Sequence, residues 1–177
     1  MTTVSFSDAD ALDLDILFRQ WVLGPLPAQT YAAQTIKLVM RCSETNTNNN
    51  LFLTWIIRAL AADDLAVIGS VVGFRRDATE AATSLTSRAD SPTSAEVITS
   101  ESHYLVIEIG MGGDPSLGGN HSSSISIGDN GAADLTEGDA DTDADNPWIE
   151  FANTITVFPN PKCPLIVRQA VQRTAVR

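Results

Sequence analysis

The sequence has 177 residues, with 22 acidic and 11 basic side chains, a formal net charge of −11 and a pI near 4.3. This negative charge argues against sequence-independent binding of nucleic acid, because such binding needs Lys and Arg to neutralise phosphates. No apolar run approaches the roughly 20 residues that a membrane span requires, and the acidic N-terminus is unlike a secretory signal. The length suits one domain with a sizeable core, and we expect neither nucleic acid nor a membrane as a partner.

The N-terminal part of the chain predicts an arm followed by a strand. Residues 1–15 carry an acidic alternation that fits either a solvated arm or a first turn of helix. Residues 16–22 mix apolar and polar side chains around Phe18 and Trp21 and predict a strand, which the Gly and Pro residues of 24–27 should break.

Three apolar runs follow. Residues 36–42 alternate with a period of two, which predicts a half-buried strand with Ile36, Leu38, Met40 and Cys42 on one face. The asparagine-rich residues 45–50 predict a hairpin loop to a second strand at 51–60. Helix is the rival assignment for 51–60, but the asparagines before it favour a strand. Residues 65–73 predict a third strand with a bend at Gly69.

The second half predicts a long polar connection and then three strands. Residues 74–102 are too long for a structureless loop in a compact domain, so we expect a short helix at 79–86 and a weak strand near 97–98. Strands are predicted at 104–110, 122–127 and 148–158. Five to seven short strands with little helix predict an all-β fold, an antiparallel β-sandwich or a barrel rather than an α/β fold.

The acidic loop between the last two strands is a candidate calcium site. Oxygen ligands at alternating positions followed by a glutamate at the twelfth position are typical of an EF-hand loop. Two features depart from that pattern, Ala144 in place of the glycine at the sixth position and Pro147 in place of an exiting helix. The alternative is a solvated acidic loop at one end of the fold. The candidate ligands are Asp139, Asp141, Asp143, Asp145 and Glu150.

Catalytic patterns are absent from the sequence, so we expect no enzyme. His103 and His121 are the only histidines, and the serine directly after His121, Ser122, points to the opposite face of a strand. Two cysteines, Cys42 and Cys163, either pair across the fold or remain free thiols. The tryptophans and tyrosines either fill the core or line a sugar-binding face.

The C-terminal segment, residues 159–177, has the opposite charge to the rest of the chain. It carries a formal charge of +4 and no acid, which leaves −15 for residues 1–161. We expect either a partly solvated terminus or an arm that docks on an acidic neighbouring subunit. The candidate partner-binding residues are Lys162, Arg168, Arg173 and Arg177.

Four stretches resemble a recurring pattern in virion proteins of tailed bacteriophages. They are Tyr104-Leu-Val-Ile-Glu-Ile-Gly110, Ile127-Gly-Asp-Asn-Gly131, Asp134-Leu-Thr-Glu137 and Pro147-Trp-Ile-Glu-Phe151. Phe18-Arg-Gln-Trp-Val22, the alternating run at 36–42 and Ser43-Glu-Thr-Asn46 also fit. The resemblance covers roughly residues 16–158, which we take as the domain between an N-terminal arm (1–15) and a basic C-terminal arm (159–177).

The resemblance implies a jelly-roll-like β-sandwich and a structural role in a virus particle. The expected role is a capsid decoration or minor capsid protein that binds the outer shell through its termini. The alternative is a tail fibre or a tail-tip module that binds a receptor or carbohydrate. The implied partners are the major capsid protein or other virion subunits, with association as a homo-oligomer such as a trimer. The implied location is the virion, assembled in the host cytoplasm, and no cofactor is implied beyond the calcium ion considered above.

Overall fold

The computed structural model describes residues 2–8, 15–113, 121–127, 134–135 and 146–157. These residues form eleven strands and no helix. The strands are β1 (Thr2–Asp8), β2 (Asp15–Leu26), β3 (Gln29–Tyr31), β4 (Ile36–Glu44), β5 (Leu51–Leu60), β6 (Val67–Arg76), β7 (Thr86–Asp90), β8 (Val97–Thr99), β9 (His103–Gly113), β10 (His121–Ile127) and β11 (Trp148–Phe151). No helix in this part of the chain could therefore span a bilayer.

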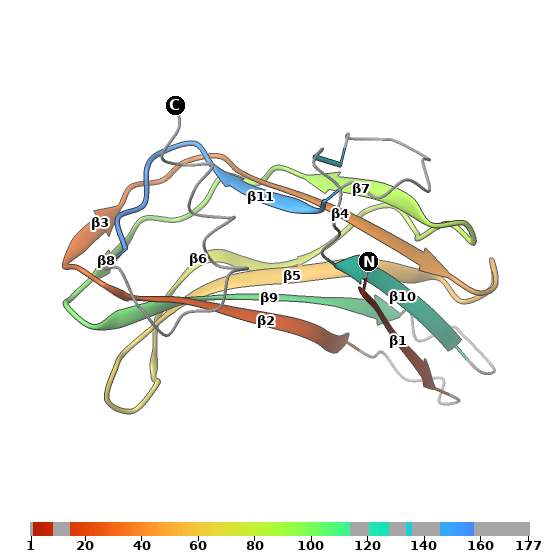
Figure 1. Ribbon diagram of the computed structural model, residues 1–177, viewed down its shortest axis with the longest axis horizontal. Coiled ribbons are helices and arrows are strands. Elements are labelled where there is room, and N and C mark those ends of the chain that lie inside the picture. The colour runs from red at the N-terminus through yellow and green to blue at the C-terminus, as the bar shows by residue number, and fades with distance from the viewer. Residues whose placement is uncertain (1, 9–14, 114–120, 128–133, 136–145, 158–177) are drawn as a thin grey trace.

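Two antiparallel sheets pack face to face (Figure 1). The first sheet has the order β1-β10-β4-β11, and β7 pairs with the other edge of β4. The second sheet has the order β2-β9-β5-β6, and a short ribbon of β3 and β8 lies at one end of the sandwich. The predicted antiparallel β-sandwich is therefore confirmed.

One hydrophobic core joins the two sheets. Ile36, Leu38, Met40 and Cys42 of β4 all point into it, as their alternation predicts. The second sheet contributes alternate residues of β5 and β9 from the opposite side. These are Leu51, Leu53, Trp55, Ile57 and Ala59 of β5 and Leu105, Ile107, Ile109 and Met111 of β9.

The connection at 45–50 is not the hairpin loop that its composition predicts. It joins β4 in the first sheet to β5 in the second, and these two strands do not pair. One edge of β4 is occupied by β10 and β11, and the other is occupied by β7. Since β4 has no edge left for its neighbour in sequence, the chain crosses to the other layer.

The helix predicted at 79–86 is absent, and β7 begins at its end. The backbone here hydrogen-bonds to other elements instead of to itself. The amide of Asp77 donates to the carbonyl of Leu53 at 2.8 Å, and that of Ala81 donates to Leu51 at 2.7 Å. The carbonyl of Ala82 accepts from the amide of Glu44 at 2.9 Å. These bonds hold the segment extended. The weak strand predicted near 97–98 is present as β8.

Several element boundaries also differ from the prediction. β2 continues through the Gly–Pro segment to Leu26, with a register shift between Leu23 and Leu26 that replaces the predicted break. The strand predicted at 148–158 ends at Phe151. The run at 51–60 is a strand, not a helix. Residues 2–8 of the predicted N-terminal arm are β1, which pairs with β10, and the division into arms and domain stays a prediction.

Candidate functional site

Most of the predicted site residues lie outside the described part of the chain. This applies to Asp139, Asp141, Asp143 and Asp145 of the acidic loop and to Lys162, Arg168, Arg173 and Arg177 of the basic segment. Glu150 is the exception. It lies half-buried in β11, opposite Lys37 of β4. Among the described residues, no group of three or more His, Cys, Asp or Glu side chains could hold a metal ion.

The base of the acidic loop is fastened to the outer side of the first sheet. Asp134 and Asn146 form a parallel bridge, and the amide of Leu135 donates to the carbonyl of Asn146 at 3.0 Å. The indole NH of Trp148 donates to the carbonyl of Leu135 at 2.9 Å. The ammonium group of Lys37 lies 5.7 Å from the centre of the Trp148 ring, a cation–π contact. The two ends of the loop are therefore held together.

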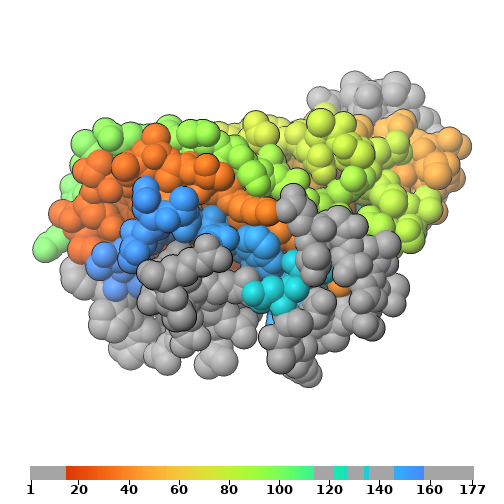
Figure 2. All heavy atoms as spheres, turned by 90° about the horizontal axis from the view of Figure 1, so that it is seen from above, coloured from red at the N-terminus to blue at the C-terminus, as the bar shows by residue number. Residues whose placement is uncertain are grey.

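The outer side of β4 is buried as well as its core side. Arg41 is 1% exposed and Val39 is fully buried, although the sequence predicts a half-buried strand. Leu135, at the loop base, is also buried. Figure 2 shows this side of the molecule, with β11 and the residues after it (blue) lying beside β3 and β4 (orange). The first sheet is thus covered on both faces where β4 runs.

Two carboxyl groups, Glu44 and Glu80, hold the connection between the sheets. A Glu44 side-chain oxygen accepts from the amide of Leu51 at 3.1 Å, and a Glu80 oxygen accepts from the amide of Asn50 at 3.1 Å. Glu44 is 2% exposed. Its burial, together with a hydrogen bond and charge repulsion from Glu80, raises its pKa to about 7.

Basic and acidic side chains of the neighbouring segments surround this carboxyl pair. The guanidinium of Arg88 donates to the carbonyl oxygen of Glu80 and lies 3.9 Å from the carboxylate of Asp77. Cys42 is a buried free thiol in the same region, and burial raises its pKa to about 12. A thiol with such a pKa remains protonated at neutral pH and is a poor nucleophile. Cys163, with which Cys42 would form the disulfide considered above, lies outside the described residues.

A second polar cluster centres on Asp90. Its carboxylate accepts two hydrogen bonds from the guanidinium of Arg75, at 3.0 and 3.1 Å, and one from the indole NH of Trp55 at 2.9 Å. Burial by itself raises the pKa of Asp90, but these donors outweigh burial and hold the pKa below its usual value. The cluster ties β7 to β5 and β6, and thereby one sheet to the other.

The histidines and serines do not form a catalytic arrangement in the described structure. His103 accepts a hydrogen bond from the amide of Ser100 through Nδ1 at 3.1 Å, which closes the turn before β9. The side chain of His121 lies outside the described set. Ser43 and Ser124 hydrogen-bond to each other through their hydroxyl groups at 2.9 Å. The described hydrogen bonds of these groups hold strands and turns together.

None of the tryptophans or tyrosines is exposed. Trp55 and Tyr31 are buried in the core, and Trp21 packs partly buried against it. Trp148 is half-buried at the loop base, and Tyr104 is half-buried against Gly24. A face of exposed aromatic rings, as a sugar-binding surface requires, is therefore absent from these five positions.

Exposed large apolar side chains gather instead on the second sheet and at one end of the sandwich. Leu17 and Val22 of β2 and Phe74 of β6 are exposed, whereas no large apolar side chain is exposed among the first-sheet residues whose side chains are described. The connection between β5 and β6 adds Leu65, and the ribbon adds Ile98. These exposed apolar residues lie on both edge strands of the second sheet and at one end of the sandwich. Sequence patterns did not reveal them, because strand pairing decides which apolar residues share a face.

The comparisons with known proteins do not identify a family. No family model matches the sequence, and no curated protein does. Two solved structures of infectious bursal disease virus, of the Gt and Gx strains, are similar at a TM-score of 0.36 and 13% identity. This chain aligns over 70% and 73% of its length, and the matches span 29% and 31% of those chains. A likeness of this degree does not establish a shared role.

Proposed function

We propose that this protein is a non-enzymatic structural component of a virus particle, a capsid decoration or minor capsid protein that binds the outer shell through its termini. The observation that carries the proposal is the place where the described chain ends at residue 157, just before the basic C-terminal segment. That place is an end of the sandwich that also carries exposed apolar side chains.

Hydrogen bonds hold the chain at this end, just before the basic segment. The side-chain amide of Gln29 donates to the carbonyl of Thr156 at 2.7 Å and accepts from its amide at 3.3 Å. Figure 1 shows the residues after β11 (blue) ending beside the ribbon of β3 and β8. Ile98 of the ribbon is 68% exposed and Leu65 of the neighbouring connection is 61% exposed. The described chain thus ends, just before the basic segment, at an end of the sandwich that carries exposed apolar side chains.

Charge separation within the chain favours attachment to an acidic neighbour. A segment of charge +4 on a body of charge −15 is attracted to acidic surfaces while the body itself is repelled by them. The partners we propose are the major capsid protein or other virion subunits, contacted through Lys162, Arg168, Arg173 and Arg177. The resemblance to tailed-bacteriophage virion proteins supports this assignment and a location in the virion.

A binding assay with purified shells tests the attachment. We expect deletion of residues 159–177 to abolish binding, because the arm supplies the attractive charge. A full-length variant with Gln at positions 162, 168, 173 and 177 should also lose binding, whereas a Leu65→Ser variant should weaken it only partly. Binding that survives deletion of the arm would refute its docking role, and labelling at the tail tip instead of the shell would refute the location.

We also propose that the acidic loop binds calcium through Asp139, Asp141, Asp143, Asp145 and Glu150. The support is the alternating ligand pattern and the closed loop base at Asp134 and Asn146. Removing calcium with EDTA should then lower the melting temperature, and an Asp141→Asn variant should abolish that effect. A melting temperature that EDTA leaves unchanged in low-calcium buffer would exclude the site.

The alternative function, a tail fibre or a tail-tip receptor- or carbohydrate-binding module, gains no support from the aromatic residues. A sugar-binding face needs exposed rings, and the tryptophans and tyrosines of this chain are buried or half-buried. We therefore retain the shell-bound structural protein as the proposed function.

A further inference from the structure

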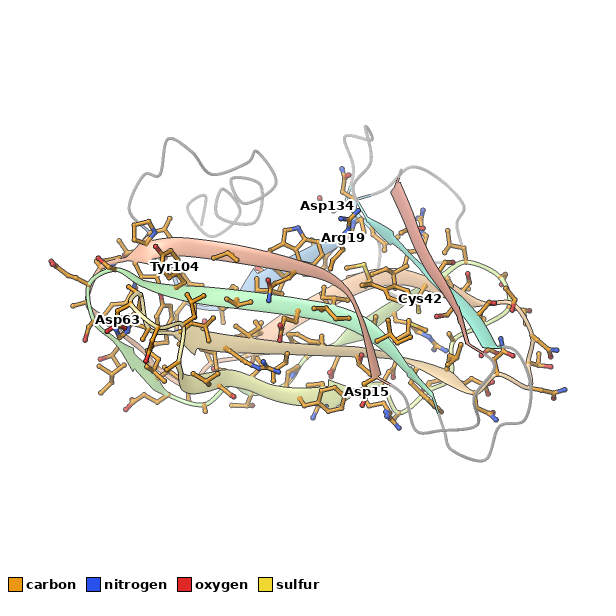
Figure 3. All side chains as sticks on the ribbon, turned by 90° about the horizontal axis from the view of Figure 1, so that it is seen from below. Asp15, Arg19, Cys42, Asp63, Tyr104 and Asp134 are labelled. Carbon is orange, nitrogen blue, oxygen red and sulfur yellow. The ribbon has the colours of Figure 1, made fainter. Side chains whose placement is uncertain are left out.

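The outer face of the second sheet, the side turned away from the core, is free of any described element. In Figure 3 this sheet is the layer nearest the viewer. Strand alternation and register define which residues lie on the face, since their neighbours in sequence point into the core. The face comprises Asp15, Leu17, Gln20 and Val22 of β2, Val106, Glu108, Gly110 and Gly112 of β9, Thr54, Ile56 and Arg58 of β5, and Ser70, Phe74 and Arg76 of β6.

Apolar side chains on this face are exposed along both edge strands. Phe74 of β6 and Leu17 of β2 are each 53% exposed, and Val22 is 43% exposed. Apolar side chains that are about half exposed are costly in water, at about 25 cal/mol for each Å² of apolar surface left uncovered. An apolar partner surface would remove that cost.

The charged side chains of the face form ion pairs, so their charges cancel. Arg76 lies 3.0 Å from the carboxylate of Asp15, and Arg58 lies 3.3 Å from that of Glu108. Gln20 also donates to Glu108 at 2.9 Å. Two acids and two bases give the face no net charge, although the chain carries −11. Two copies can therefore approach each other here without the repulsion that acts elsewhere.

Glycines keep this face flat. A Cβ atom at position 112 would collide with the carboxylate of Asp15 and press on the guanidinium of Arg76, so the ion pair lies across the backbone of Gly112. At position 110, a Cβ atom would collide with the carbonyl of Ile16. The face is therefore low at these two glycine positions, which lets another sheet approach closely there.

We propose that the outer face of the second sheet binds the same face of a second copy of this chain across a twofold axis. With strands about 4.8 Å apart and about 3.3 Å per residue, four strands of about ten residues present roughly 600 Å². Two such faces bury about 1,200 Å², which reaches the lower end of stable protein interfaces. We place the axis between Arg58 and Glu108, so that Arg58 of each copy faces Glu108 of the other, because in an isologous interface a contact from one residue to a second is repeated from the second to the first.

Sedimentation or light scattering of the purified full-length chain tests this dimer. We expect the wild type to form dimers at micromolar concentration and Phe74→Glu to raise the dissociation constant at least about tenfold. Ile98→Glu is the matched control, since Ile98 is at least as exposed but lies on β8, away from this face. Melting curves of each variant establish that its monomer is folded.

A charge-reversal pair makes the test specific for this face. Arg58→Glu and Glu108→Arg should each abolish the dimer, because each leaves four like charges facing one another across the axis. A mixture of the two variants should recover dimers of wild-type affinity, since each then meets its complement. A monomeric wild type at high micromolar concentration, or a mixture that stays monomeric beside a dimeric wild type, would overturn the proposal. The assay contains no shell, so its failure leaves the proposed attachment through the C-terminal arm intact.

Discussion

At the scale of single residues, the Glu44–Glu80 pair is the most consequential polar feature. Each carboxyl group accepts a backbone hydrogen bond from the connection between the sheets. Two carboxylates side by side repel each other, so a proton retained on the buried Glu44 stabilises this arrangement. The connection therefore depends on a group that titrates near neutral pH.

The raised pKa of Glu44 has a definite effect on stability. Its native pKa of about 7 exceeds the ordinary value of 4.5, so the native state keeps a proton that the unfolded chain releases. The free energy of unfolding should fall as the pH rises from 4.5 to about 7 and remain low above that. Glu44→Gln should remove this decline and stabilise the protein at pH 8 by about 1 to 3 kcal/mol.

Chemical denaturation across this pH range measures the effect. Glutamine fits the site, because its oxygen can accept from the Leu51 amide while its NH₂ group donates to Glu80. Glu101→Gln, in an exposed turn, is the control and should leave the pH dependence as it is. A Glu44→Gln protein that keeps the wild-type decline would contradict the assignment.

At the scale of elements, close contact between β2 and β9 depends on one glycine. β2 carries a bulge between Leu17 and Arg19, beside Gly110 of β9. The bulge brings the carbonyl of Ile16 over the backbone of Gly110, where any side chain would collide with it. Two long strands of the second sheet thus pair in register only because position 110 lacks a Cβ atom.

Two glycine substitutions test this contact. Gly110→Ala should destabilise the protein by at least about 2 kcal/mol, because β2 must move away from β9. Gly73→Ala is the matched control, since no atom lies within 4 Å of its added Cβ, and it should change stability by less than about 0.5 kcal/mol. Thermal unfolding measures both. Equal melting temperatures for the two variants would show that the strands adjust without cost.

At the scale of the whole molecule, one core connects both sheets, so the sandwich should unfold as a unit. Leu38 of the first sheet and Leu53 of the second belong to the same cluster. Removing a buried leucine side chain costs about 2–5 kcal/mol. Neither sheet can bury its inner face without the other.

Unfolding of two core variants tests this cooperativity. Leu38→Ala and Leu53→Ala should each lower the midpoint of tryptophan fluorescence and of far-ultraviolet circular dichroism together. Trp55 lies in the shared core, so its fluorescence reports contact between the sheets. Separate transitions, with Leu38→Ala moving only one of them, would mean that the sheets unfold independently.

Local pattern was sufficient for the central strands. The alternation of residues 36–42 and the apolar run at 51–60 gave both the strands and their inward residues, because a period of two leaves a strand only one way to bury its apolar side chains. The prediction failed at 79–86, where the length of the connection was the reason to expect a short helix. Hydrogen bonds to Leu51, Leu53 and Glu44 come from elements distant in sequence, and no local pattern contains them.

By itself, then, the sequence determined the all-β class, the main strands and the opposite charges of body and C-terminal segment, since these follow from side-chain chemistry and period. Only the tertiary structure decided which sheet each strand joins, because β4 could pair with β5 or with β7, β10 and β11. It also decided that Glu44 meets Glu80 and that Phe74 and Leu17 are exposed on one face of the second sheet. Such juxtapositions depend on strand order and register, which long-range packing selects and local sequence does not encode.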